Sequence, residues 1–111
     1  MNDAQFPWVI LVPRVSNISE LYHLDQVQRQ LLETESIYLS KVLMNVYSGD
    51  KLNVAALGNV VSQLHIHHVV RFERDAVWPA PVWGKLAAIP LSEEDVIEHK
   101  GKLLELINPK W

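Results

Sequence analysis

The sequence has 111 residues, which is enough for one domain with a substantial core and too few for two. Hydrophobic residues make up 49%, charged residues 21%, and the formal net charge is −3, which excludes a disordered chain and a basic nucleic-acid-binding surface. There is no cysteine, which excludes disulfides, thiolate catalysis and cysteine-ligated zinc.

The N-terminal part is predicted to hold one buried strand. Phe6–Val12 is apolar and is closed by Pro13. Because this strand begins so early, we expect either a sheet edge or further chain upstream of Met1. The apolar run is too short to span a membrane, and no secretion signal precedes it, so we expect a cytoplasmic protein. A short helical turn is predicted at Ile18–Leu21.

The next segment, Leu24–Ser48, is predicted to be one long amphipathic helix. Asp25 and Gln28 have the spacing of an N-terminal capping box, and Gly49 stands where a left-handed C-terminal cap belongs. The apolar positions at helical spacing are Val27, Leu31, Leu32, Tyr38, Leu39, Val42, Leu43 and Val46.

Two strands follow. Lys51–Leu57 alternates in polarity, Gly58–Ser62 is a short loop, and Gln63–Phe72 is the next strand, so we expect an antiparallel hairpin that brings Asn53 near the following strand.

The last third of the chain is predicted to be a stiff loop and a helix. Trp78–Gly84 contains two prolines and two tryptophans, which indicate a rigid loop. Ser92 caps a helix over Glu93–Ile107, and Asn108-Pro109 ends it.

Three of the five histidines lie in one strand. Alternation places Gln63, His65 and His67 on one face, and Leu64, Ile66, His68 and Val70 on the other. Two imidazoles about 6–7 Å apart along a strand can flank one small anionic group.

Three interpretations of these histidines remain open. They can be structural histidines of a half-buried strand. They can be metal ligands, although His68 points away and leaves two imidazoles where a zinc site needs three or four ligands. They can be phosphoryl-transfer groups, in which His65 attacks phosphorus and Gln63 and His67 stabilise the developing charge.

The segment resembles the motif of the histidine triad (HIT) family of nucleotide hydrolases and transferases. That motif alternates His-φ-His-φ-His-φ-φ, where φ is apolar, and residues 63–69 read Gln-Leu-His-Ile-His-His-Val. Residues 2–14, 52–59 and 78–84 are similar to a bacterial branch often called HIT-like or diadenosine-tetraphosphate-hydrolase-like. The resemblance covers essentially the whole chain.

The resemblance implies a role for each matching residue. His65 would be the nucleophile that takes the nucleotidyl group, His67 would hold phosphate oxygens, and Gln63 replaces the first histidine. Substrate contacts would come from Asn53 and Asn59, which match amides that contact phosphate or ribose, and from Asn2 and Asp3, near the ribose-binding position.

The resemblance also implies an α+β fold with a meandering antiparallel sheet, a long helix and a C-terminal helix. It implies a homodimer, a purine nucleotide as partner, no cofactor and no metal. Family members usually have a further strand before the position of Met1.

Structural interpretations stand beside these roles. Asn53 can bond across the hairpin, and Asn2 and Asp3 can be turn formers. Arg71, Arg74 and Lys85 can be solvated surface charges, and Trp78 and Trp83 can pack the C-terminal loop or a dimer interface.

The leading hypothesis is a hydrolase or transferase that cleaves at the α-phosphate of a dinucleoside polyphosphate or nucleoside phosphoramidate through a nucleotidyl-histidine. The alternative, prompted by Gln63, is a catalytically weak or inactive nucleotide-binding protein.

Overall fold

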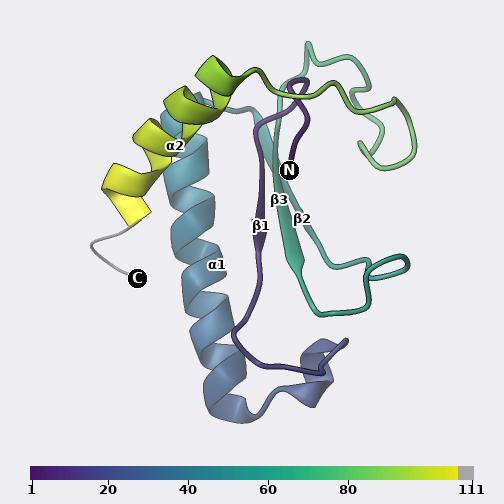
Figure 1. Ribbon diagram of the computed structural model, residues 1–111, viewed down its shortest axis with the longest axis vertical. Helices are drawn as coiled ribbons and strands as arrows, with labels where there is room; N and C mark the ends of the chain where they lie inside the picture. The colour runs from purple at the N-terminus through teal and green to yellow at the C-terminus, as the bar shows by residue number, and fades with distance from the viewer. Residues whose placement is uncertain (108–111) are drawn as a thin grey trace.

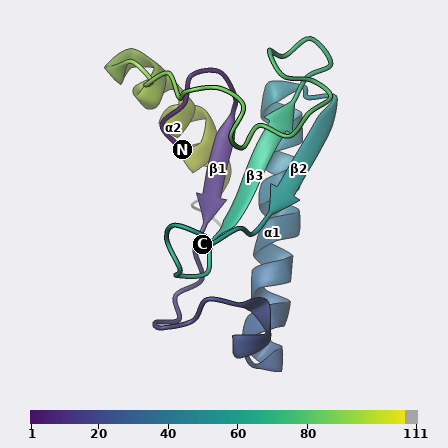
Figure 2. The same cartoon turned by 90° about the vertical axis from the view of Figure 1, so that its right-hand side faces the viewer.

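The structure, a computed structural model, describes residues 1–107, which form a three-stranded antiparallel sheet and two α-helices. In chain order the elements are β1 (Trp8–Leu11), a short 3₁₀ helix (Leu21–His23), α1 (Gln26–Tyr47), β2 (Lys51–Ala55), β3 (Ile66–Arg71) and α2 (Glu93–Ile107). Figure 1 shows α1 running alongside the sheet, and Figure 2 shows it behind the strands. The predicted α+β class, with a long helix and a C-terminal helix, is confirmed.

The central strand of the sheet is β3, with β1 on one side and β2 on the other. The antiparallel pairing of β2 with β3 confirms the predicted hairpin. On the other side Ile10 lies opposite His67, and Val9 lies opposite His68. Because neighbouring side chains of a strand point to opposite faces, His67 and His68 lie on different faces of the sheet.

The strands are shorter than predicted, and His65 lies just before β3 rather than in it. The pairing ends at Leu11–Ile66 on one side and at Ala55–His67 on the other, so the chain before Ile66 has no strand beside it among the described residues. The N–H of Leu64 donates instead to the carbonyl of Ile18, at 2.8 Å. The helical turn predicted at Ile18–Leu21 is a 3₁₀ helix displaced to Leu21–His23.

Both ends of α1 have identifiable caps. The Asp25 carboxylate accepts from the Gln28 N–H at 2.8 Å, and the Gln28 side chain accepts from the Asp25 N–H at 2.9 Å, which confirms the predicted capping box. At the other end the prediction is wrong, because the left-handed residue is Ser48, with φ 51° and ψ 46°, rather than Gly49. Gly49 serves close packing instead, since a Cβ there would lie 2.3 Å from Cγ1 of Val70.

The main core lies between α1 and the sheet. Its buried residues are Leu11, Ile18, Leu24, Leu32, Leu39, Leu43, Leu64, Ile66 and Val70. Two positions of the predicted apolar face are wrong: the side chains of Val27 and Leu31 are 74% and 58% exposed. The first turns of α1 extend beyond the ends of the strands, where no sheet covers them (Figure 1).

On the opposite face of the sheet, which carries His67, the segment between β3 and α2 packs around Val69. Val82 from this segment is buried against Phe6 and Val69, with Trp8 and Trp83 packed around them. Val82 and Trp83 of the predicted stiff loop therefore join Phe6, Trp8 and Val69 in a second, smaller core.

The C-terminal helix has the predicted bounds. Ser92 Oγ accepts from the N–H of Asp95 at 3.1 Å, as expected of a helix cap, and the predicted stop at Asn108-Pro109 lies outside the described residues. Within residues 1–107, neither helix combines the length and the apolar character needed to cross a lipid bilayer.

Candidate active site

The imidazoles of His65 and His67 lie side by side at the start of β3. His65 is half-buried, and His67 is buried. Their ring centroids are 4.9 Å apart, with the planes at 69°. His65 Nδ1 lies 2.7 Å from the carbonyl oxygen of Gln63. A carbonyl can only accept, so Nδ1 carries the hydrogen and Nε2 of a neutral His65 keeps a free lone pair. That is the tautomer a nucleophilic imidazole needs.

The side chain of His67 is buried, 8% exposed, and is enclosed by two indoles. Its ring centroid lies 5.6 Å from that of Trp8 and 5.6 Å from that of Trp83, and both contacts are edge-to-face. Trp8 Nε1 donates to His67 Nδ1 at 2.9 Å. Burial, with the charge of His65 as a smaller cause, lowers the pKa of His67 below its ordinary value, so this imidazole stays neutral at pH 7.

His68 has no part in this pair, as predicted from strand alternation. It is fully buried on the α1 side, where Nε2 lies 2.8 Å from Ser36 Oγ and Nδ1 lies 3.3 Å from the carbonyl oxygen of Ile66. Burial lowers the pKa of His68. Among residues 1–107 no group of three or more His, Cys, Asp or Glu side chains is arranged to hold a metal ion.

Gln63 contacts His65 through its backbone. The carbonyl of Gln63 holds His65 Nδ1, while its side-chain amide Nε2 donates to the carbonyl of Val15 at 3.0 Å. This carboxamide is therefore tied to the segment that follows β1. The same residue thus bonds to Val15 through its side chain and to His65 through its carbonyl.

Asn53 lies on the same face of the sheet as His67, as the hairpin predicts, but its amide oxygen is engaged by Arg71. Nη1 of Arg71 donates to Asn53 Oδ1 at 2.8 Å. Its Nε and Nη2 donate to the carboxylate of Asp75 at 2.8 Å and 3.1 Å. The interpretation of Arg71 as a solvated surface charge is wrong, because its side chain is 1% exposed. Asn53 thus has the cross-hairpin bond that its structural interpretation requires.

The two N-terminal candidates are bonded to the segment before α2. Asn2 Oδ1 accepts from the N–H of Leu91 at 2.8 Å, and the buried carboxylate of Asp3 accepts from Gln5 and from the N–H of Ile89. Both side chains are therefore occupied in holding two distant parts of the chain together.

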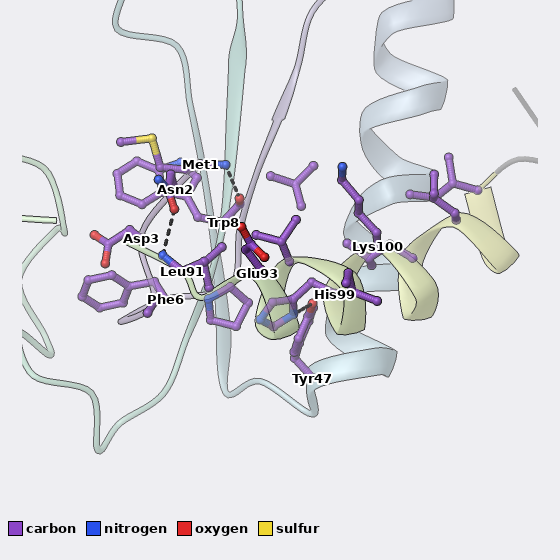
Figure 3. Close-up of a pocket in the computed structure, with 18 residues that line it drawn as sticks. Met1, Asn2, Asp3, Phe6, Trp8, Tyr47, Leu91, Glu93, His99 and Lys100 are labelled. Atoms are coloured by element: carbon purple, nitrogen blue, oxygen red, sulfur yellow. Dashed lines mark hydrogen bonds between the residues drawn. The ribbon is translucent and has the colours of Figure 1, made fainter. Parts of the chain in front are cut away.

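A cavity of about 870 Å³ lies between this N-terminal segment and α2. Figure 3 shows Asn2 and Asp3 at one end of it and Tyr47, His99 and Lys100 at the other. Neither His65 nor His67 is among its lining residues. The cavity is mostly apolar and of ligand size, but the structure does not join it to the imidazole pair.

His65 opens instead onto a small depression of about 30 Å³ formed with Ser19, Glu20 and the loop 56–58. Asn59 is exposed just beyond this loop. The structure therefore brings His65, His67 and the β2–β3 loop together, and holds Asn53, Asn2 and Asp3 in contacts of their own.

Sequence reasoning missed Trp8 as a neighbour of the histidines. Trp8 precedes His67 by 59 residues, and only the register of β1 against β3 brings them together. The pattern of Phe6–Val12 indicated a strand but contained no signal for its partner.

Comparisons with known proteins bear on the family and the fold of this chain. The family model described as HIT domain matches residues 1–74. A histidine triad protein from Marinobacter aquaeolei VT8 is 53% identical, with a TM-score of 0.95, over 98% of this chain and 80% of that one. Histidine triad proteins from Bradyrhizobium japonicum and Sinorhizobium meliloti 1021 are 41% and 37% identical, each with a TM-score of 0.93 over 96% of this chain and 80% and 79% of theirs. No curated protein matches the chain.

Proposed function

Because the chain belongs to the histidine triad (HIT) family, we propose that it is a nucleotide hydrolase or transferase that cleaves at the α-phosphate of purine nucleotide conjugates. The substrates are dinucleoside polyphosphates or nucleoside phosphoramidates. The observation that carries the proposal is the bond between His65 Nδ1 and the Gln63 carbonyl, which leaves Nε2 as a free nucleophile beside a second imidazole.

In the first step His65 Nε2 attacks the α-phosphorus and forms an N–P bond while the bond from phosphorus to the leaving group breaks. The leaving group departs with the bonding electron pair and takes a proton from solvent water. In the second step water attacks the nucleotidyl-histidine, the N–P bond breaks, and the nucleoside monophosphate and free His65 are released. Two displacements replace one difficult reaction by two easier ones.

His67 stabilises the charge that develops on the non-bridging oxygens, together with backbone N–H groups of Gly58–Ser62. Donors placed where charge develops lower the barrier because they need no reorganisation during the reaction. Gln63 contributes its carbonyl, which fixes the tautomer of His65. We retain Asn59 as a substrate contact, since it is exposed beside the loop, and assign Asn53, Asn2 and Asp3 to holding the site's surroundings.

Replacing His65 with Ala tests the proposal directly. The variant should lose turnover of an adenosine phosphoramidate and of diadenosine tetraphosphate while keeping its circular dichroism spectrum and its unfolding midpoint. A control is Glu98→Gln, since Glu98 is exposed on α2 and lies outside the pair and the depression beside it. Undiminished turnover in His65→Ala would refute the assignment.

A nucleotide-binding protein without significant turnover is the second candidate. One observation favours it. Gln63 stands where the motif has its first histidine, and its side-chain amide is bonded to the carbonyl of Val15. Calorimetry with adenosine monophosphate separates the two, because binding with no turnover of either substrate supports this candidate. We also expect a homodimer in the cytoplasm, and light scattering after size exclusion tests the dimer.

A further inference from the structure

The hydrogen bond between Trp8 and His67 fixes more than the position of a ring. An indole N–H can only donate, so the nitrogen that receives it, His67 Nδ1, must be unprotonated. A neutral imidazole carries one hydrogen, which is then on Nε2. Because burial disfavours the charged form, this neutral state is the one present at pH 7.

The tautomers of the two imidazoles give opposite properties to atoms of the same name. On His65, the Gln63 carbonyl keeps the hydrogen on Nδ1 and leaves Nε2 as an acceptor. On His67, Nδ1 accepts a hydrogen bond from the Trp8 indole, and the hydrogen on Nε2 remains available as a donor. A nucleophile beside a donor is the combination that a phosphoryl group requires, whereas two acceptors would repel its oxygens.

Trp8 is itself held in place by the second core. Its ring lies edge-to-face on Trp83, with centroids 5.7 Å apart and planes at 84°, and its backbone belongs to β1. Trp83 packs on His67 at the same 5.6 Å as Trp8 does, but its Nε1 is buried without a hydrogen-bond partner among the described residues. Two indoles therefore enclose His67, and only Trp8 bonds to it.

We propose that Trp8 is a positioning residue that sets the tautomer of His67 and so makes its Nε2–H a donor toward the anionic group of the substrate. The tautomer stands independently of any reaction, and its consequence for turnover rests on the proposed function. Trp8 acts through His67 and has no contact with the reacting atoms. In metal sites, where this is best measured, substituting a residue that orients an imidazole through its far nitrogen commonly lowers metal affinity or activity about 10- to 100-fold.

The two tryptophans supply a matched pair of variants. Trp8→Phe and Trp83→Phe each remove one indole N–H and keep an aromatic ring against His67, but only the first removes a hydrogen bond. Long-range ¹H–¹⁵N spectra of the histidine rings report the tautomer. The wild type and Trp83→Phe should show His67 with its hydrogen on Nε2, whereas Trp8→Phe should show the Nδ1–H form or a mixture, with a raised His67 pKa.

Turnover of adenosine phosphoramidate is the second readout. The loss of kcat in Trp8→Phe should exceed that in Trp83→Phe by at least about tenfold, with the acid limb of the pH profile moved in the first variant alone.

The proposal is overturned if wild-type His67 carries its hydrogen on Nδ1, a result that needs no variant to fold. It is also overturned if Trp8→Phe leaves the tautomer unchanged or if both variants change it equally. A wild-type protein with the expected tautomer and no turnover would refute the proposed function and leave the role of Trp8 intact.

Discussion

The buried pair of Arg71 and Asp75 gives the sharpest test of how the face of the sheet that carries His67 is held together. The two side chains are 1% and 5% exposed, and the guanidinium meets the carboxylate through two bonds of 2.8 and 3.1 Å. Asp75 also accepts from the backbone N–H groups of Phe72, Val77 and Trp78. Asp75→Asn keeps the shape and removes the charge.

Two routes give the cost of this substitution. Removing one partner of a buried ion pair typically costs about 3–5 kcal/mol. The Arg71 hydrogen bond, as the largest cause, lowers the pKa of Asp75 from 3.8 to about 2, which corresponds to about 2 kcal/mol at neutral pH. The second figure is smaller because it counts only the stability lost on protonation. Since Asn keeps one acceptor oxygen, we expect a loss of about 2–4 kcal/mol, or roughly 8–16 °C in the unfolding midpoint.

The assay is thermal and urea unfolding at pH 7, with Glu98→Gln as the matched control. Glu98 pairs with Lys102 on the exposed face of α2, where the side chains are 59% and 48% exposed, so its loss should leave the midpoint within error. The folded pKa of Asp75 is depressed, so its contribution is present above pH 4 and is lost as the pH falls through about 2. Equal midpoints for wild type and both variants would refute the reasoning.

Two further predictions concern the contacts of β3. Gly49→Ala should destabilise the protein by about 1–3 kcal/mol, because the new methyl overlaps the fully buried Val70. Gly101→Ala, which has open space around it in α2, should stabilise the protein by about 0.5–1 kcal/mol. Urea unfolding of both variants measures the difference, and equal shifts in stability would contradict it. Because burial lowers the pKa of His68 in the folded state, the contribution of neutral His68 to stability is complete above pH 6.5 and declines as the pH falls below that value. Titration of the His68 ring by NMR, with urea midpoints measured in parallel, checks this prediction. A ring that titrates at or above pH 6.5 would contradict it.

The sequence was most informative where one local rule decides the outcome. The separation of His68 from His65 and His67 follows from the period of two along an extended chain, and the helix start at Asp25 follows from its bonds with Gln28. These features depend on residues a few positions apart.

Other features depend on which distant segments meet. The bond between Asn53 and Arg71 depends on the register of β2 against β3, and the guanidinium is held on its other side by Asp75. Trp8 could not be linked to His67 without knowing that β1 pairs with β3. A buried arginine is also rare enough that its surface location was the better expectation from sequence alone.

For His65, the prediction that its ring lies on the same side as that of His67 was useful, although the predicted start of the strand was wrong. His65 lies outside β3 because neither neighbouring strand extends that far. Its ring still lies beside that of His67, and the carbonyl that fixes its tautomer comes from Gln63, two residues before it.

The most direct test of the central claim is to trap the covalent intermediate. The protein is incubated with an adenosine phosphoramidate labelled at the phosphorus, quenched during turnover, digested and sequenced by mass spectrometry. The account predicts one adenylyl group on His65, absent from the His65→Ala variant. Steady turnover with no label on the protein, or label on another residue that persists in His65→Ala, would contradict it.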